Sequence, residues 1–292
     1  MRLSLTILAT LLISGLAQGM PVEKRAPGSL WGITYTAKGS DGSCHNAQQV
    51  AEAIKRFKSN GIKNVRTYSQ ECNQLPNILK AIGDNGGDMK VLAAVWTGSG
   101  DEQYQNELNQ LEKNLKGANK DFILGIAIGN EAVQNGVYSA DQAAGKIHDV
   151  RGRIGGGYKF GTVDTPPAFT PAMVDASDIV WVNIHPYFGG VTSDQAFGNL
   201  NDQLGAFRDQ KAKGKRVIVG EVGWPTAGDA IGNAQPNVGG MATLVKALKG
   251  SDLEYYYFES HDSKWKAGQN AIELNFGIAD QTGKSKVPDL YK

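Results

Sequence analysis

The chain has 292 residues, of which 20% are charged, and its formal net charge at pH 7 is +1. This near-neutral balance argues against nucleic acid or an anionic membrane surface as a partner. Beyond the first residues no apolar stretch is long enough to span a bilayer, and the polar segment Lys284–Lys292 is not the hydrophobic tail of a lipid-anchor signal. We therefore expect neither a nucleic-acid nor a membrane partner.

The first 25 residues are predicted to be removed from the mature protein. Arg2 precedes the apolar run Leu3–Leu16 and small residues, so residues 1–19 have the pattern of a secretory signal peptide. Residues 20–25 end in the dibasic pair Lys24-Arg25 and are predicted to be a short propeptide, the alternative being a solvated loop. Residues 26–292 then form the mature chain, with a formal charge of −1 after the loss of three basic residues and one acidic residue.

Cys44 and Cys72 are the only cysteines. In a secreted chain a disulfide between them is the favoured interpretation. Oxidation argues against a catalytic thiol, and no pair of histidines accompanies the cysteines at the spacing of a zinc site. We expect no metal and no cofactor.

Eight short apolar or β-branched runs recur along the chain at spacings of mostly about 30 residues, as expected for buried parallel strands joined by helices. The predicted strands are Leu30–Tyr35, Asn64–Tyr68, Val91–Trp96, Phe122–Ile128, Phe160–Val163, Ile179–His185, Arg216–Gly220 and Glu254–Phe258.

The segments between these runs have helical periodicity. Apolar residues fall on one face of the segment from Ala47 to Phe57, and a second stripe runs from Val238 to Leu248 before Gly250. Ser139 and Gln142 have the spacing of a capping box. A strand followed by a helix, eight times, predicts an α/β fold, a single-domain (β/α)8 TIM barrel over residues 26–292.

Catalytic residues of such barrels lie at the carboxyl ends of the strands. Glu131 follows the fourth predicted strand in Gly129-Asn130-Glu131, and Glu221 follows the seventh. A single glutamate at such a place is readily explained as a helix cap or an ion-pair partner. Two at one barrel mouth match the needs of glycoside cleavage, in which one carboxyl protonates the leaving oxygen and the other faces the anomeric carbon.

These motifs resemble glycoside hydrolase family 17, most closely its fungal cell-wall β-1,3-glucanase/β-1,3-glucanosyltransferase branch. The resemblance rests on Gly-Asn-Glu after the fourth strand and Gly-Glu-x-Gly-Trp-Pro after the seventh, and it extends over nearly the whole mature chain. Further matching segments are Trp31–Tyr35, Val65–Tyr68, Val182–Tyr187 and Tyr257–Ser260.

The resemblance implies that Glu131 is the general acid/base and Glu221 the nucleophile, so that Glu131 stays protonated and Glu221 ionised. It also implies that Asn130 binds the 2-hydroxyl of the sugar at the cleavage point, the alternative being a turn residue. Arg66 is expected to help keep Glu221 ionised, and Tyr187 to support it. His185 is expected to orient its neighbours.

Several other residues near strand ends are candidates for substrate binding. Glu259 and Lys264 resemble family positions near the cleavage site, the alternative being an ion pair between them. Asp164 binds a hydroxyl or caps a helix. Aromatic side chains supply platforms for apolar sugar faces, although each one is equally well explained as core; these are Tyr35, Tyr68, Trp96, Tyr187, Phe188, Trp224, Phe258 and Trp265.

The favoured function is a retaining β-1,3-glucanosyltransferase with some hydrolysis, for which β-1,3-glucan chains serve as donor and acceptor. The alternative is a mainly hydrolytic endo-β-1,3-glucanase. A non-catalytic glucan-binding wall protein predicts the loss of one glutamate, and a phosphate-binding barrel enzyme predicts a glycine-rich loop where Trp224-Pro225-Thr226 stands. We expect a secreted monomer that resides in a fungal cell wall.

Overall fold

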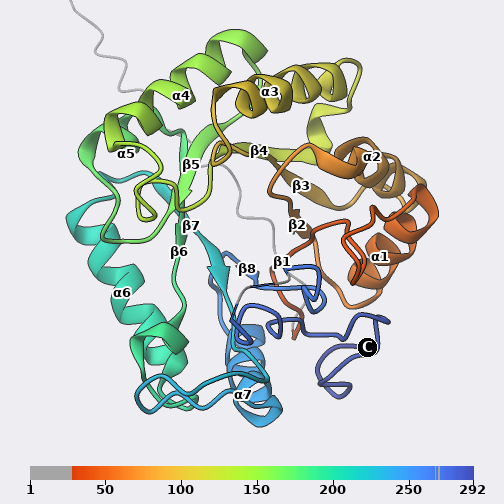
Figure 1. The fold of residues 1–292 in the computed structure, drawn as a ribbon, viewed down its shortest axis with the longest axis vertical. Coiled ribbons are helices and arrows are strands. Elements are labelled where there is room, and N and C mark those ends of the chain that lie inside the picture. Colours follow the sequence, from red (N-terminus) through yellow and green to blue (C-terminus); the bar gives the residue numbers. More distant parts are fainter. Residues whose placement is uncertain (1–27, 267, 269) are drawn as a thin grey trace, which may run out of the picture.

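The computed structural model describes residues 28–266, 268 and 270–292, so the predicted signal peptide and propeptide lie outside the described residues. Eight parallel strands form a closed barrel in which each strand pairs with the next in the chain and β8 pairs with β1. Helices surround the barrel on its outside (Figure 1). The predicted single-domain (β/α)8 barrel is confirmed.

The strands coincide with the predicted runs, shortened at some ends and lengthened at others. They are β1 Gly32–Thr34, β2 Asn64–Arg66, β3 Lys90–Val95, β4 Ile123–Ile128, β5 Phe160–Asp164, β6 Ile179–Asn183, β7 Arg216–Val222 and β8 Tyr255–Tyr257. Every residue of β5, β6 and β8 is buried. Burial on both faces explains why these strands lack polar–apolar alternation.

The helices follow the strands and carry the predicted caps. They are α1 Ala47–Ser59, α2 Gln74–Asp84, α3 Asp101–Leu115, α4 Ala140–Ile154, α5 Pro171–Ala176, α6 Ala196–Gln210 and α7 Val238–Lys249, with short 3-10 helices η1 Glu71–Asn73, η2 Lys120–Phe122 and η3 Pro186–Gly189. Ser139 and Gln142 form the capping box of α4. The apolar face of α1, which includes Val50, Ile54 and Phe57, is buried against the barrel.

One expectation fails after β8, where no helix forms in the described residues. This last segment runs as loops, with isolated bridges from Ala279 to His261 and Ser285, and its end is bound to α1. Nη1 of Arg56 donates to Gly283 O at 2.7 Å, and Nδ2 of Asn60 donates to Lys292 O at 2.6 Å. Figure 1 shows this end of the chain close to α1. The segment contributes side chains to the barrel mouth instead of covering the barrel side.

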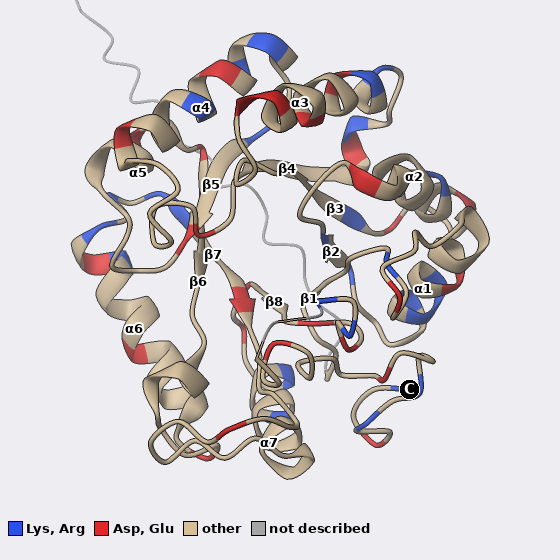
Figure 2. Cartoon of the chain, in the orientation of Figure 1, with Lys and Arg blue, Asp and Glu red and all other residues tan. Residues whose placement is uncertain are grey.

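Acidic and basic residues are interspersed on the outer helices (Figure 2). This distribution agrees with the near-zero net charge. None of the helices in the described part of the chain combines the length and apolar character that a membrane span requires.

Candidate active site

A cavity of about 1400 Å³ opens at the carboxyl ends of the strands. Its lining comes from the loops that follow most of the strands, and both Glu131 and Glu221 belong to it. Strand β4 delivers Glu131 and strand β7 delivers Glu221, so the two carboxyl groups approach one cavity from different sides of the barrel.

Glu221 is the penultimate residue of β7 and is held by two nitrogen groups. Nη1 of Arg66 donates to Oε1 of Glu221 at 2.9 Å and to Gly220 O at 2.8 Å. Nε2 of His185 lies 3.2 Å from Oε2 of Glu221. Burial alone would raise the pKa of Glu221, but Arg66 and His185 outweigh it and hold the pKa at about 2. Glu221 is therefore ionised at any ordinary pH.

Glu131 has a different environment. Burial raises its pKa, and the nearby Glu221 carboxylate raises it further. Nδ2 of Asn183 donates to Oε1 of Glu131 at 2.8 Å. The backbone of Glu131 has φ of 50°, a left-handed conformation that is unfavourable for a residue with a side chain and that aims it into the mouth.

Two asparagines join the surroundings of the glutamates. Oδ1 of Asn130 accepts from Nη2 of Arg66 at 2.7 Å and from Nδ2 of Asn183 at 3.0 Å. A continuous hydrogen-bonded chain thus runs from Glu221 through Arg66, Asn130 and Asn183 to Glu131. This network holds the two carboxyl groups in place. Two carboxyl groups whose pKa values are shifted in opposite directions suit proton donation by one and attack by the other.

Glu259 is a third buried carboxyl at this mouth. Oγ of Ser263 donates to Oε2 of Glu259 at 2.8 Å, and Nζ of Lys266 lies 3.9 Å from Oε1. Burial raises the pKa of Glu259 to about 7 despite these partners. The cation that faces Glu259 is Lys266 and not Lys264, which instead donates to Asn275.

The structure brings part of the predicted set together at the cavity. In addition to Glu131 and Glu221, the lining includes Tyr68, Trp96, Asn130, Phe188, Phe258, Glu259 and Trp265. Arg66 lies buried beneath them, with its guanidinium 4.6 Å from the centroid of the Tyr68 ring. The aromatic side chains give the cavity apolar surfaces between polar groups.

Six residues of the predicted set are not among those that line the cavity, so their contact with substrate stays a prediction: Arg66, which lies beneath the cavity, and five others whose side chains are bound elsewhere. Tyr35 bonds His45 at 2.9 Å, and Asp164 accepts from the backbone of Val133 and Thr165. The hydroxyl of Tyr187 donates to Asp229 O, and Nε1 of Trp224 donates to Gln235 O. Lys264 is bound to Asn275. These side chains support the loops around the mouth, and the place next to Glu221 belongs to His185 rather than to Tyr187.

Sequence reasoning missed Asn183, Lys266 and Phe276 as lining residues. Asn183 is the last residue of β6, and its place as a polar residue at the carboxyl end of a strand could have identified it as a lining residue. Lys266 and Phe276 lie in the segment after β8, where a helix was expected.

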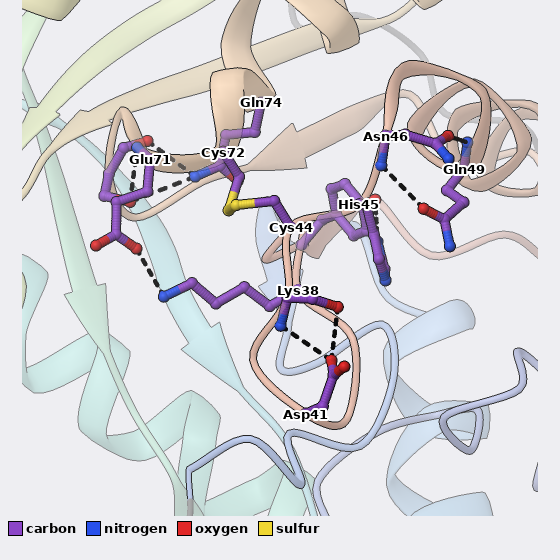
Figure 3. Close-up of a disulfide and its surroundings, with 12 residues drawn as sticks. Lys38, Asp41, Cys44, His45, Asn46, Gln49, Glu71, Cys72 and Gln74 are labelled. Atoms are coloured by element: carbon purple, nitrogen blue, oxygen red, sulfur yellow. Dashed lines mark hydrogen bonds and ion pairs between the residues drawn. A yellow bond between two sulfur atoms is a disulfide. The ribbon is translucent and has the colours of Figure 1, made fainter.

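The two cysteines form a disulfide with a Cα–Cα distance of 5.1 Å. It joins the loop after β1 to the loop after β2 (Figure 3). Within the described residues, no group of His, Cys, Asp and Glu side chains has the arrangement of a metal site.

Comparison with known proteins agrees with this architecture. The model of the BtgE/BtgC glycoside hydrolase domain matches residues 32–277. An Aspergillus flavus protein described as a probable beta-glucosidase, btgE, is 33% identical over 264 residues, which is 87% of this chain and 43% of the relative. A Saccharomyces cerevisiae protein described as a probable family 17 glucosidase, SCW10, is 26% identical and is covered to 64%, against 85% of this chain. The chain therefore spans only part of the length of these curated relatives.

Among solved structures, an active-site mutant of a β-1,3-glucanosyltransferase from Rhizomucor miehei in complex with laminaritriose is similar in fold. Its TM-score is 0.78 at 24% identity, with 88% of this chain and 95% of that chain covered. An endo-laminarinase from Formosa has a TM-score of 0.73 at 18% identity, with 89% of this chain and 86% of that chain covered. Because the family model covers most of the described barrel and the A. flavus relative exceeds 30% identity, the chain belongs to the BtgE/BtgC glycoside hydrolase domain family, in the fungal branch of glycoside hydrolase family 17.

Proposed function

We propose that the chain is a retaining β-1,3-glucanosyltransferase that transfers glucosyl units between β-1,3-glucan chains, with some hydrolysis. The observation that carries the proposal is the opposite pKa shift of two carboxyl groups in one cavity, raised for Glu131 and lowered to about 2 for Glu221. A proton donor and an ionised carboxylate that share one site are the requirements of glycosidic double displacement.

In the first step Glu131 donates its proton to the glycosidic oxygen while Glu221 attacks the anomeric carbon. The bond to the leaving chain breaks, and a covalent glucosyl ester forms on Glu221. In the second step the ionised Glu131 removes a proton from the 3-hydroxyl of an acceptor glucan, which attacks the same carbon and releases Glu221. Oδ1 of Asn130 is occupied by Arg66 and Asn183, which leaves its amino group to donate to a sugar hydroxyl.

Transfer requires an acceptor that binds well enough to compete with water. Trp96 follows β3 and Phe188 follows β6, so both line the part of the cavity near Glu131, which follows β4. The side chain of Phe188 is exposed, with 46% of its surface accessible. Apolar ring faces at this place favour binding of an acceptor sugar over open access of water. The glucanosyltransferase of R. miehei, whose active-site mutant forms a complex with laminaritriose, has a similar fold.

The second candidate is an endo-β-1,3-glucanase that is mainly hydrolytic, and the Formosa endo-laminarinase has the same fold. We further propose that the chain is a secreted monomer of the fungal cell wall. The apolar run at residues 3–16 supports secretion, although it lies outside the described residues.

The experiment is incubation of the protein with laminari-oligosaccharides of defined length, followed by mass analysis and by NMR of the newly formed anomers. The expected products include chains longer than the donor, with the β configuration retained. If every product is shorter than the donor, the transferase proposal is wrong and the hydrolase is favoured.

The matched control is Glu221→Gln, which keeps the shape of the side chain and removes the attacking group. We expect its turnover to fall below about one-thousandth of the wild-type rate, equivalent to about 4 kcal/mol of barrier. Turnover close to the wild-type rate would overturn the assignment of Glu221.

A further inference from the structure

The proposed proton donor has a backbone conformation that depends on its surroundings. The φ of Glu131 is 50°, and a residue with a β-carbon keeps such an angle only where the neighbouring structure holds it there. In this conformation Glu131 lines the cavity and accepts from Nδ2 of Asn183 at 2.8 Å. The groups that hold the backbone therefore determine whether the carboxyl group reaches the site.

The chain that leads into Glu131 is bonded to both neighbouring strands. The backbone N of Gly129 donates to Val95 O of β3 at 3.0 Å, and that of Glu131 donates to Val163 O of β5 at 2.9 Å. Gly129 has a φ of 77°, and a β-carbon at this position would collide with the Tyr138 hydroxyl. The entry to the turn is thus fixed by backbone bonds and by close packing.

The chain that leads out of Glu131 is held by Asp164, the last residue of β5. Oδ2 of Asp164 accepts from the backbone N of Val133 at 3.0 Å, and Oδ1 accepts from that of Gln134 at 3.3 Å. Glu131 O accepts from the backbone N of Asn135 at 2.9 Å, so one helical turn begins at Glu131. The first N–H groups of such a turn have no partner within it, and the Asp164 carboxyl group binds them as an N-cap side chain does.

The surroundings of Asp164 suit this role. Only 1% of Asp164 is exposed, and Oδ1 also accepts from the backbone N of Thr165 at 2.9 Å. N–H groups only donate, so three of them around one carboxyl group favour its ionised form. The Thr165 hydroxyl donates to Oε1 of Gln134 at 2.7 Å. Side chains at the end of β5 therefore hold the turn after Glu131 by three hydrogen bonds.

Asp164 also acts on Glu131 through its charge. Burial raises the pKa of Glu131 most, the Glu221 carboxylate raises it next, and the Asp164 carboxylate raises it further. The charged or titratable groups that face Glu131 are Glu221 on β7, Asp164 on β5 and His185 after β6, while Arg66 on β2 lies beyond Asn130. Removal of the Asp164 charge therefore lowers the pKa of Glu131.

We propose that Asp164 is a positioning residue for proton donation: by capping the turn after Glu131 it keeps that residue in its left-handed conformation, with the carboxyl group directed at the glycosidic oxygen. Asp164 itself does not line the cavity and acts through Glu131. The inference rests on the proposed function, because it presupposes that Glu131 is the proton donor.

The test compares two substrates, of which only one needs a proton donor. Laminari-oligosaccharides have a sugar leaving group that must be protonated, whereas dinitrophenyl β-laminaribioside releases an acidic phenol without protonation. For Asp164→Ala we expect kcat/KM on the oligosaccharides to fall by roughly 10- to 100-fold, and the rate of the phenol burst to change by less than about 2-fold. Asp164→Asn keeps one acceptor oxygen and is expected to recover part of the loss.

The pH profile distinguishes positioning from a general loss of stability. Asp164→Asn removes the negative charge, so Glu131 loses its proton at a lower pH. The basic limb of kcat/KM on the oligosaccharides is therefore expected to move to lower pH. A substitution that only weakens the fold reduces the fraction of active protein and moves neither this limb nor the ratio between the two substrates. Should Asp164→Ala fail to fold, Asp164→Asn supplies both measurements.

Asp178→Ala is the matched control. Oδ2 of Asp178 accepts from the backbone N of Phe160 at 2.9 Å, so this aspartate also binds the backbone of β5. Phe160 is the first residue of the strand, at the end away from the mouth. The control is expected to lose stability in a thermal unfolding scan and to keep the wild-type basic limb and the wild-type ratio between the two substrates.

Three results would overturn the proposal: equal losses on both substrates in Asp164→Ala, wild-type activity of this variant on the oligosaccharides, or an unmoved basic limb in Asp164→Asn. Failure of the proposed function looks different, because Glu131→Gln would then lose no more activity on the oligosaccharides than on the dinitrophenyl substrate. Glu131→Gln is therefore assayed beside the Asp164 variants.

Discussion

Nη1 of Arg66 lies 2.9 Å from Oε1 of Glu221, and only 1% and 7% of the two side chains are exposed. A carboxylate without a partner at this depth would take up a proton, because burial penalises the charged form. The guanidinium therefore decides the protonation state of Glu221, and it also donates to Gly220 O and Asn130. Arg66, together with His185, therefore determines both the charge and the position of Glu221.

Arg66→Gln removes this charge and leaves the carboxylate buried. The pKa of Glu221 is expected to rise well above 2, with His185 as the remaining nitrogen partner. Because only ionised Glu221 attacks, the acidic limb of the pH profile of kcat/KM is expected to move to higher pH. Breaking a buried pair on one side also costs about 3–5 kcal/mol of folding free energy, measured by denaturant unfolding. An acidic limb at the wild-type position would contradict this role of Arg66.

The barrel and the glutamate pair were predictable because their causes are local. Strands buried on both faces read as apolar runs, and catalytic groups of such barrels follow strand ends. The pairing of His185 with Glu221 was not predictable in this way. The register of β6 against β7 shifts between Val182 and Asn183, and such irregularities decide which side chains at a strand end face the mouth.

Tyr187 illustrates the same limit. It lies two residues after His185 and would share its direction in an extended chain. The chain turns instead into η3 at Pro186–Gly189, so the Tyr187 hydroxyl meets Asp229 O and its ring packs against Trp224 at a centroid distance of 5.2 Å. The prediction of Lys264 instead of Lys266 near Glu259 has a similar origin, because among the described residues no helix or strand follows β8 and no periodicity indicates which lysine faces the site.

Glu131→Gln tests the proton donor. The variant keeps the hydrogen bond from Asn183, since its side-chain oxygen still accepts. We expect kcat to fall by about 10²–10⁴-fold on laminari-oligosaccharides. Aryl β-glucosides with acidic leaving groups need no protonation, so formation of the glucosyl-enzyme from them is expected to be nearly unchanged, as measured by the burst of released phenol. An equal loss on both substrates would argue against acid catalysis by Glu131.

Trp96→Ala tests the acceptor side of the cavity. The indole lines the cavity, its Nε1 donates to Ser99 at 3.0 Å, and its backbone N donates to Glu107. Loss of one stacking surface is expected to weaken acceptor binding by roughly 2- to 10-fold, so the ratio of transfer to hydrolysis falls. The product ratio at several acceptor concentrations measures this change. Trp96→Phe retains a ring and is the matched control, expected to keep most of the transfer.

The disulfide closes a sequence separation of 28 residues. By the loss of loop entropy in the unfolded chain, its removal in Cys44→Ala/Cys72→Ala is expected to cost about 3–4 kcal/mol. For a domain of this size the loss corresponds to a decrease in Tm of roughly 6–16 °C in a thermal unfolding scan. A Tm equal to that of the wild type would show that the loops are held without the covalent bond.

The raised pKa of Glu259 predicts how the free energy of unfolding changes with pH. The native pKa is raised from 4.5 to about 7, so between these values the native state binds the proton more tightly than the unfolded chain. Stability contributed by this proton is fully present below about pH 4, is lost as the pH rises toward 7, and stays lost above it. The loss amounts to at most about 3 kcal/mol.

Glu259→Gln removes the titrating group but keeps an acceptor for Ser263, and Lys266 keeps Glu273 at 3.8 Å as a second partner. Relative to the wild type, the variant is therefore expected to gain stability between pH 4.5 and pH 8, seen as a difference in Tm that grows with pH. Glu52→Gln, an exposed change of the same kind on α1, is the control and is expected to show no such trend. Because burial is the largest cause of the raised pKa, a difference in Tm that stays constant across this range would mean that Glu259 is ionised in the native protein and that water reaches it.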